Sequence, residues 1–333
     1  MHEPLRIGVL GAAAIAPAAI VKPARLVERA EVTAVAARDR TRAERFATKW
    51  GIPRVLGTYD EVVADPDVDA VYNPLPNSLH APWTIKALEA GKHVLCEKPL
   101  TSNRAEAEVV AAVAAASPGV LMEAFHYRYH PSMHRAVEIV RSGELGPLRS
   151  VEAWMQVPLF KPGDIRFDPA LAGGAVMDLG CYTIHQLRTL TGEEPEVVSA
   201  AAKQRPPGID RLMRAELRFP SGTRGRFTVS LYGARLLRLA LRATGDRGSL
   251  HIVNPTTPQL PQRFTVTVDG RRRRERFDKV ATYTCQLDAF VAAALDGAEV
   301  LTGPADAIAN MAVIDAVYAA AGMQPRGPAE TAP

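Results

Sequence analysis

Three side chains capable of acid–base chemistry recur at helical spacing in the middle of the chain. Asp178, Tyr182 and His185 stand at positions i, i+4 and i+7 of a predicted helix from Asp178 to Leu190. Residues at this spacing share one face of an α-helix. A carboxylate, a phenol and an imidazole on one face could hold and move a proton. Packing of the tyrosine in a core is the alternative interpretation.

A second candidate site is the turn after the first predicted strand, Leu5–Gly11. The turn reads Gly11-Ala12-Ala13-Ala14-Ile15-Ala16, and only its first glycine fits the dinucleotide-binding pattern G-x-G-x-x-G/A. That pattern works because a tight turn brings backbone amides at a helix N-terminus close to phosphates. Gly11 allows the turn, whereas Ala13 adds a methyl at the pyrophosphate. We predict that Gly11 to Ile15 bind a dinucleotide, with an ordinary buried β–α turn as the alternative.

The end of the second predicted strand, Glu31–Arg38, bears on the choice of dinucleotide. Rossmann proteins that prefer NAD commonly place a carboxylate there to hold the ribose hydroxyls. Here Ala37 is followed by Arg38, and Arg42 comes one turn later. A guanidinium can form paired hydrogen bonds to a 2′-phosphate, so these three residues favour NADP(H) over NAD(H). A surface arginine that starts a solvated helix is the alternative, and Asp39 is predicted to cap that helix.

The elements that must position these residues fall into two halves. The first 124 residues alternate short apolar runs with amphipathic helices, including one predicted over Ile15–Arg29. This alternation is typical of a parallel sheet covered on both faces. Beyond Arg149, β-rich segments and turns predict an open, mostly antiparallel sheet framed by helices. Its expected strands are 151–157, 211–219, 224–231, 236–244 and 263–269, followed by a solvated hairpin over the basic run 271–274.

The predicted architecture is therefore an α/β Rossmann domain followed by an α+β domain. The first would cover residues 1–124 and bind the dinucleotide. The second would cover residues 125–325, bind the substrate and support oligomerisation, and residues 326–333 would form a loose tail. An open sheet leaves one face that needs cover, so we expect a homo-oligomer, either a dimer or a tetramer.

Composition excludes several classes of function. A net charge of +4 is too mild and too dispersed to predict a nucleic-acid partner, although it suits a phosphate-bearing ligand. Three scattered cysteines without a CxxC pair predict neither a disulfide framework nor a metal site, and they fit a reducing compartment. The longest small-apolar stretch, Val109–Ala116, is too short to cross a bilayer. We expect a cytoplasmic protein with no membrane partner.

Three further segments carry a family resemblance. The first runs from Asn73 to His80 (NPLPNSLH), the second from Ala87 to Leu100 (ALEAGKHVLCEKPL) and the third from Asp168 to Tyr182 (DPALAGGAVMDLGCY). Together they resemble the Gfo/Idh/MocA oxidoreductases. Within that family the chain is most similar to the branch of glucose–fructose oxidoreductase, dimeric dihydrodiol dehydrogenase and deoxysugar ketoreductases. The resemblance extends over residues 5 to 320.

The resemblance implies roles for individual residues. Lys98 would point at the nicotinamide, beside an unusual backbone turn at Glu97 and Pro99, and Arg166 would reach the cofactor. Tyr182 occupies a position that is histidine in relatives similar to inositol dehydrogenase. The remaining cofactor contacts implied are Pro74, Leu75, Asn77, His80 and Glu97. The substrate contacts suggested by the resemblance or by helix position are His126, Tyr127, Arg128, His185 and Tyr283.

Lys98 and Tyr182 form a chemically sensible pair. A free tyrosine has a pKa of about 10, and a nearby ammonium lowers it toward working pH. Asp178 would fix Lys98 electrostatically or accept a hydrogen bond from the substrate. The sequence thus predicts an NADP(H)-dependent oxidoreductase of a sugar, keto-sugar, polyol or diol, with Tyr182 as acid/base and Lys98 tuning it. An NAD-dependent glycosidase of the same fold and a non-catalytic cofactor sensor are the alternatives.

Overall fold

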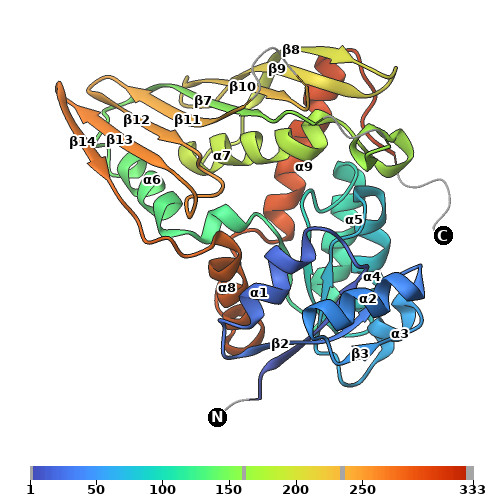
Figure 1. Ribbon diagram of the computed structural model, residues 1–333. Coiled ribbons are helices and arrows are strands. Elements are labelled where there is room, and N and C mark those ends of the chain that lie inside the picture. The colour runs from blue at the N-terminus through green and yellow to red at the C-terminus, as the bar shows by residue number, and fades with distance from the viewer. Residues whose placement is uncertain (1–2, 160–162, 233–236, 328–333) are drawn as a thin grey trace. The chain divides into compact units, whose positions relative to one another are not determined.

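The computed structural model describes residues 3–159, 163–232 and 237–327, which form two compact units (Figure 1). The first unit contains residues 3–129 and the later segment Tyr283–Ile308, and the second contains His130–Thr282 and residues 309–327. The domain boundary predicted between residues 124 and 125 stays a prediction. The structure adds that the segment 283–308 packs with the first unit. Residues 328–333 of the predicted tail lie outside the described residues.

The first unit is built on a parallel sheet of six strands in the order β3-β2-β1-β4-β5-β6. The strands are β1 (Leu5–Leu10), β2 (Ala30–Ala36), β3 (Arg54–Val55), β4 (Ala70–Asn73), β5 (His93–Cys96) and β6 (Leu121–Glu123). Each neighbouring pair is parallel. This confirms the predicted Rossmann sheet, and the strand order reverses between β1 and β4.

Helices cover both faces of this sheet. They are α2 (Arg40–Trp50), α3 (Tyr59–Ala64), α4 (His80–Glu89), α5 (Arg104–Ala116) and, from late in the chain, α8 (Thr282–Asp296), with short turns η2 (Asn77–Leu79) and η3 (His126–Tyr129). Leu287 and Phe290 of α8 join one core with Ile7 and Val9 of β1 and Tyr72 of β4. Burial of such side chains explains why α8 belongs to the first unit, since each contributes roughly 1.5–3 kcal/mol.

The first crossover differs from its prediction. A helix was expected over Ile15–Arg29, but the structure has a π turn η1 (Pro17–Val21) and a single short helix α1 (Lys22–Ala24). Pro17 is the first residue of this helical stretch, where a missing N–H is tolerated, whereas Pro23 lies inside it and cannot donate to the preceding turn. The sequence pattern is apolar enough for a helix over the whole range, and the helical stretch is limited to residues 17–24.

The second unit holds an eight-stranded sheet in the order β14-β13-β12-β11-β7-β10-β9-β8. The strands are β7 (Leu148–Gln156), β8 (Glu196–Gln204), β9 (Asp210–Arg218), β10 (Arg224–Ser230), β11 (Arg238–Gly245), β12 (Gly248–Val253), β13 (Arg263–Val268) and β14 (Arg271–Glu275). Among the described strands of this sheet, β7 and β10 alone pair in parallel, which confirms a mostly antiparallel sheet. The basic run forms a hairpin with β13, as expected, whereas β8 and β12 were not predicted. Residue 236, the first of the strand expected over 236–244, lies outside the described residues.

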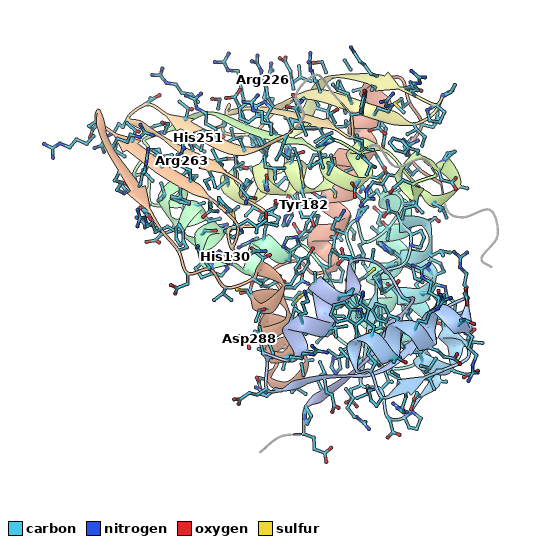
Figure 2. All side chains as sticks on the ribbon, in the orientation of Figure 1. His130, Tyr182, Arg226, His251, Arg263 and Asp288 are labelled. Carbon is cyan, nitrogen blue, oxygen red and sulfur yellow. The ribbon has the colours of Figure 1, made fainter. Side chains whose placement is uncertain are left out.

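The two faces of this sheet differ in chemistry. One face is apolar, with Phe227 and Leu241 among its buried side chains, and α7 (Cys181–Thr191) packs against β7 and β10 next to α6 (Pro131–Arg141). The alternating residues point the other way, and Arg226, His251 and Arg263 are exposed there (Figure 2). The remaining helix, α9 (Pro304–Ala320), begins in the first unit and continues into the second.

The helix predicted over Asp178–Leu190 starts differently in the structure. Residues Val176–Gly180 form a π turn, η6, and α7 begins only at Cys181. Asp178 therefore lies on the π turn, with its amide bonded to the Gly174 carbonyl. A π turn has a different period from an α-helix, and the shared helix face of Asp178 and Tyr182 stays a prediction.

Candidate functional site

The turn after β1 and the loop after β4 meet where the strand order reverses. Gly11 has a φ of +92°, a conformation that side-chain-bearing residues rarely adopt, and a Cβ there would lie 3.2 Å from Cδ2 of Leu75. Ala12 is buried, whereas Ala14 and Ile15 are exposed. Ligands of open α/β sheets bind in this crevice outside the carboxyl ends of the strands. The structure thus brings two predicted cofactor segments together at such a point.

The two arginines after β2 have different surroundings. Arg42 donates from Nη2 to the carbonyl of Ala12 at 2.8 Å, so it braces the turn after β1. The Asp39 carboxylate accepts the amide of Arg42, which confirms the predicted cap of α2. Arg38 and Arg42 are both exposed, and Arg42 is the one held against the turn after β1.

Tyr59 is a neighbour of this turn that the sequence did not single out. A Cβ on Gly11 would lie 3.6 Å from the Tyr59 hydroxyl, and the Tyr59 ring packs edge-on against Trp83 with centroids 5.1 Å apart. Burial raises the pKa of Tyr59, and the Arg38 guanidinium opposes that rise. Tyr59 is therefore a partly buried phenol close to both Gly11 and Arg38. Its only signal in the sequence is its place at the start of α3.

His80 links the loop after β4 to the end of β5. Its Nδ1 lies 2.7 Å from the Pro99 carbonyl and its Nε2 lies 2.7 Å from the Leu75 carbonyl. The Lys98–Pro99 peptide between β5 and this contact is cis. Burial, with a contribution from the Lys98 charge, lowers the pKa of His80 to about 4. A neutral ring can donate to only one of these two carbonyls, so the contacts with Pro99 and Leu75 oppose the effect of burial on the pKa of His80.

The Lys98 charge acts on a second buried imidazole, that of His126. His126 stacks on Tyr283 with ring centroids 4.1 Å apart, and burial together with the Lys98 charge lowers the pKa of His126 to about 3. Beside them Tyr72 donates to the Glu97 carboxylate at 2.8 Å. Burial, and to a lesser extent the Glu97 charge, raises the pKa of Tyr283. The Lys98 charge thus acts on both His80 and His126.

In the second unit, Arg166 and Asp178 form an ion pair. Nε of Arg166 lies 2.7 Å from Oδ2 of Asp178, and Nη1 lies 3.1 Å from the Asp164 carboxylate. Arg166 belongs to the turn η4 (Ile165–Phe167), which precedes η5 (Pro169–Leu171). The Asp178 charge raises the pKa of Arg166. Two residues that the sequence selected for different roles therefore contact each other directly.

Tyr182 and His185 both lie on α7, and both are buried, with 5% and 1% of their surfaces exposed (Figure 2 labels Tyr182). The Asn310 amide donates to the Cys181 carbonyl at 3.2 Å and fixes the first turn of this helix. Arg188, further along α7, pairs with Glu194. α7 is thus held along its length by polar contacts as well as by packing.

The remaining predicted residues divide between the two units. All the predicted cofactor residues except Arg166 lie in the first unit, together with Lys98 and the substrate candidates His126, Tyr127, Arg128 and Tyr283. Asp178, Tyr182, His185 and Arg166 lie in the second. Tyr127 is fully buried and packs edge-on against Phe125. The roles assigned to all these residues stay predictions.

Comparison with known proteins decides the family. Residues 5–125 match the oxidoreductase family GFO/IDH/MocA with an NAD-binding Rossmann fold, and residues 133–251 match the GFO/IDH/MocA C-terminal domain. The chain belongs to this family. Its six-stranded parallel sheet and its eight-stranded, mostly antiparallel sheet are the two folds that the family combines, as expected from the sequence.

Individual relatives of this GFO/IDH/MocA oxidoreductase act on sugars. It is 36% identical to D-xylose 1-dehydrogenase (NADP⁺) 2 of Haloferax volcanii, over 95% of this chain and 97% of the relative. It is 33% identical to dTDP-3,4-didehydro-2,6-dideoxy-α-D-glucose 3-reductase of Actinomadura kijaniata, over 95% of each chain. The solved structure of KijD10, a 3-ketoreductase from Actinomadura kijaniata in complex with NADP and TDP-benzene, matches with a TM-score of 0.89, 31% identity and coverage of 96% and 98%.

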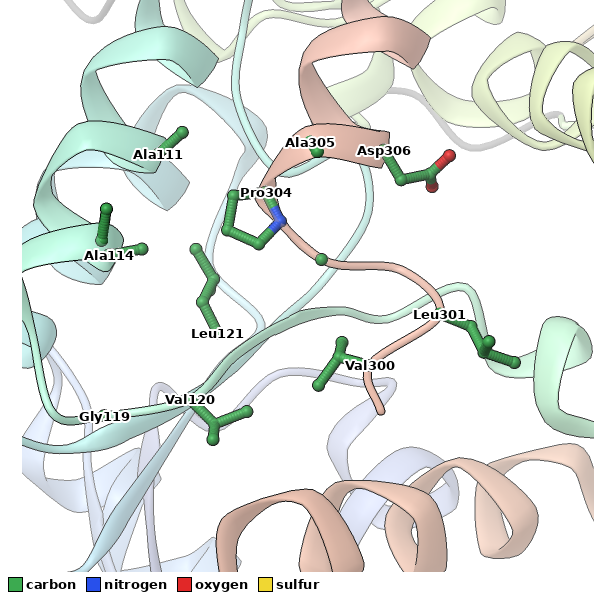
Figure 3. A pocket seen from close by; sticks show the side chains of 12 residues that line it. Ala111, Ala114, Gly119, Val120, Leu121, Val300, Leu301, Pro304, Ala305 and Asp306 are labelled. Carbon is green, nitrogen blue, oxygen red and sulfur yellow. The ribbon is translucent and has the colours of Figure 1, made fainter. Parts of the chain in front are cut away.

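A separate groove of this oxidoreductase lies on its first unit and contains none of the predicted residues. It has a volume of about 600 Å³ and is lined by small and apolar side chains of α5, β6 and the segment 300–306 (Figure 3). Within the described ranges, no three His, Cys, Asp or Glu side chains gather as a metal site would require. None of the described helices is long and apolar enough to span a membrane.

Proposed function

We propose that the chain is an NADP(H)-dependent oxidoreductase that transfers a hydride to or from a sugar, keto-sugar or related polyol or diol. The observation that carries this proposal is the meeting of Gly11, Leu75 and the Lys98–Pro99 strand end around His80, at the reversal of strand order. The sugar-directed names of the relatives support the substrate class.

The residues at this reversal fit a dinucleotide. The turn after β1 carries no side chain larger than a methyl between Gly11 and Ala14, and its exposed part, Ala14 and Ile15, precedes the helical turn at Pro17. Small side chains let a pyrophosphate approach the backbone amides. Bound there, NADP(H) supplies the hydride chemistry. Pro74, Leu75 and Asn77 would hold its ribose and nicotinamide side, and Glu97 and His80 would fix the loops around it.

The preference for NADP(H) rests on Arg38. Its exposed guanidinium follows β2, where a carboxylate would favour NAD. Arg42 is committed to the Ala12 carbonyl, so it contributes by shaping the turn. The NADP-dependent relative and the NADP complex of KijD10 are consistent with this preference.

Tyr182 is proposed as the acid–base group and Lys98 as the charge that tunes it. A ketone oxygen needs a proton when its carbon receives a hydride, and a cation lowers the pKa of a phenol toward working pH. Burial and the Lys98 charge lower the pKa values of His80 and His126, which supports a role for the Lys98 charge in this part of the site. Solved KijD10 variants replace a lysine and a tyrosine separated by the same number of residues as Lys98 and Tyr182, which supports this pair.

Asp178 and Arg166 complete the proposed site. Asp178 would accept a hydrogen bond from a substrate hydroxyl, and Arg166 would hold it in place while reaching the cofactor. His126, Tyr127, Arg128, His185 and Tyr283 would contact the sugar. His126 and Tyr283 suit this role because their stacked rings offer an apolar surface with polar edges.

A substrate panel tests the proposal. Sugars, nucleotide keto-sugars and dihydrodiols would be incubated with NADP⁺ or NADPH, and NADPH absorbance would be followed together with product analysis. We expect stoichiometric change of NADPH with at least one carbohydrate-like substrate. Release of a free sugar without net change of the cofactor would instead indicate a glycosidase, and absence of turnover with every substrate would contradict the proposal.

A further inference from the structure

The glycine pair Gly173–Gly174 marks a crowded crossing in the second unit. A Cβ on Gly173 would lie 2.6 Å from the carbonyl oxygen of Arg166. A Cβ on Gly174, whose φ is +136°, would lie 2.2 Å from Oδ1 of Asp210 and 2.8 Å from Nη2 of Arg326. Only glycine fits at such distances. The pair therefore lies between the Arg166 loop on one side and a buried polar cluster on the other.

That cluster is centred on Asp210, the first residue of β9, which is completely buried. Its Oδ2 accepts the amide of Val176 at 2.7 Å, and its Oδ1 accepts the Tyr318 hydroxyl at 3.0 Å and Nη2 of Arg326 at 2.8 Å. Val176 is the first residue of the π turn η6, which carries Asp178. A buried carboxylate thus anchors the start of the turn that holds a proposed active-site residue.

Arg326 supplies the charge that balances Asp210. It is 8% exposed, its guanidinium lies over the Tyr318 ring at 4.5 Å, and its Nη1 donates to the Gly208 carbonyl at 2.6 Å. Burial raises the pKa of Asp210, and Arg326 is the strongest influence in the opposite direction. A buried ion loses its main stabilisation when its partner is removed. The ionised state of Asp210 therefore depends on a residue close to the C-terminus.

We propose that Arg326 is a positioning residue for Asp178 and for its ion pair with Arg166. Arg326 keeps Asp210 ionised, Asp210 fixes the amide of Val176, and the π turn then presents Asp178 to Arg166. The Gly173 crossing holds the Arg166 backbone against the same turn. This inference rests on the proposed function only where it predicts an effect on turnover, because the effect on the π turn can be measured without substrate.

The test compares Arg326→Met with Arg326→Lys and with a control, Arg135→Met, in the full-length protein. Arg135 forms a partly exposed ion pair with Glu275 on strand β14 of the same sheet, so its loss removes an arginine–carboxylate pair away from η6. Amide hydrogen exchange would be followed in peptides covering Gly174–Gly180. We expect exchange there to become at least about tenfold faster in Arg326→Met, with no change in Arg135→Met and partial protection in Arg326→Lys.

Turnover and its pH dependence supply the second readout. Without Arg326, Asp210 should be protonated at neutral pH, so kcat of Arg326→Met should fall about tenfold and recover as the pH is raised. Asp210→Asn should show no such recovery, because an amide does not ionise. Guanidinium ion at millimolar concentration should restore part of the lost kcat in Arg326→Ala but none in Arg135→Ala.

Each pattern of results decides the inference. Faster exchange over 174–180 with lower kcat supports it. Unchanged exchange overturns it, whether or not kcat falls, because Arg326 would then act elsewhere. Faster exchange with normal kcat also overturns it, since the π turn would not matter for turnover. If the wild type turns over none of the substrates, the proposed function fails, and the exchange data alone decide whether Arg326 holds the turn.

Discussion

Arg166 and Asp178 lie 2.7 Å apart, Nε to Oδ2, although one belongs to the turn η4 and the other to the π turn η6. The carboxylate is half-buried and the guanidinium also contacts Asp164. An ion pair of this kind fixes both side chains in one geometry. A change in Asp178 should therefore also affect Arg166, and a change in Arg166 should affect Asp178.

Arg166→Met and Asp178→Asn should be strongly non-additive. Each single variant leaves a partly buried polar partner behind, so the double variant should lose less kcat/KM than the product of the singles, with a coupling of about 0.5–3 kcal/mol. Steady-state kinetics on the three variants measure this. Arg166→Met should also weaken NADPH binding more than Asp178→Asn does. Equal effects on NADPH binding would contradict a cofactor role for Arg166.

Arg38→Ala should reduce the preference for NADP(H). The exposed guanidinium is proposed to bind the 2′-phosphate, and a paired, charge-assisted contact is worth about 1.5–3 kcal/mol. NADPH affinity should fall by about tenfold to a hundredfold while NADH affinity changes little. Isothermal titration with both cofactors checks this. Arg40→Ala is the matched control, because Arg40 is a neighbouring exposed arginine that pairs with Glu44. Equal affinities for the two cofactors in the wild type would contradict the prediction.

Acid should destabilise the fold through His126 and His80. Their pKa values in the folded state, about 3 and about 4, lie below the unfolded value of about 6.5. The unfolded chain therefore binds more protons between these limits. The contribution of these two histidines to the free energy of unfolding is fully present above pH 6.5. It should decrease as the pH drops toward 4, by about 1.4 kcal/mol per pH unit for each histidine.

His126→Phe is the variant that checks this pH dependence. Phenylalanine keeps a ring against Tyr283 but cannot titrate. The free energy of unfolding should therefore depend less steeply on pH, because the contribution of one histidine is removed. Denaturant unfolding at several pH values between 7 and 5 measures it. His134→Phe, at an exposed position on α6, should leave the slope unchanged. The same slope in His126→Phe and wild type would mean that His126 already titrates normally.

The sequence predicted those parts of the fold that depend on local periodicity. The parallel sheet, the Asp39 cap and the hairpin over Arg271–Arg274 follow from apolar spacing, a capping residue and an Asp-Gly turn. The strand β8 was missed because its alanine-rich, largely exposed run carries no apolar alternation. The π turn before α7 was missed because its residues have an ordinary helical composition.

Contacts between residues that are distant in the sequence could not be predicted. Arg166 and Asp178 were selected separately, but nothing in their spacing indicates an ion pair. Asp210 and Arg326 are 116 positions apart, and their contact depends on how β9 and the C-terminal segment fold together. The sequence does signal that cluster at Gly173–Gly174, where two adjacent glycines indicate a close approach of other chain segments.

His185→Ala should change substrate recognition and leave cofactor binding intact. His185 is buried on the same helix as Tyr182, and it is proposed to contact the sugar. KM should rise by about tenfold or the order of preferred substrates should change, while the NADPH dissociation constant stays within about twofold. Kinetics on the substrate panel and cofactor titration measure the two effects. A similar loss of NADPH affinity would show that His185 serves the cofactor or the helix as a whole.

Tyr182→Phe tests the proton transfer itself. The substitution removes one hydroxyl and keeps the ring of a side chain that is 5% exposed, so folding and cofactor affinity should be preserved. kcat should fall by about 10²–10⁴-fold, the usual contribution of one acid–base group. Lys98→Met should cost at least as much, because it removes the charge that tunes the phenol. The double variant should be scarcely worse than the poorer single one, since residues that act as a unit are non-additive.

Steady-state kinetics with thermal melts measure all three, and the pH profile of Tyr182→Phe should lose one limb. A near-normal kcat in Tyr182→Phe would assign the proton to another group, with Asp178 and His185 next. If the loss of kcat in the double variant equals the product of the two single losses, Lys98 and Tyr182 act independently.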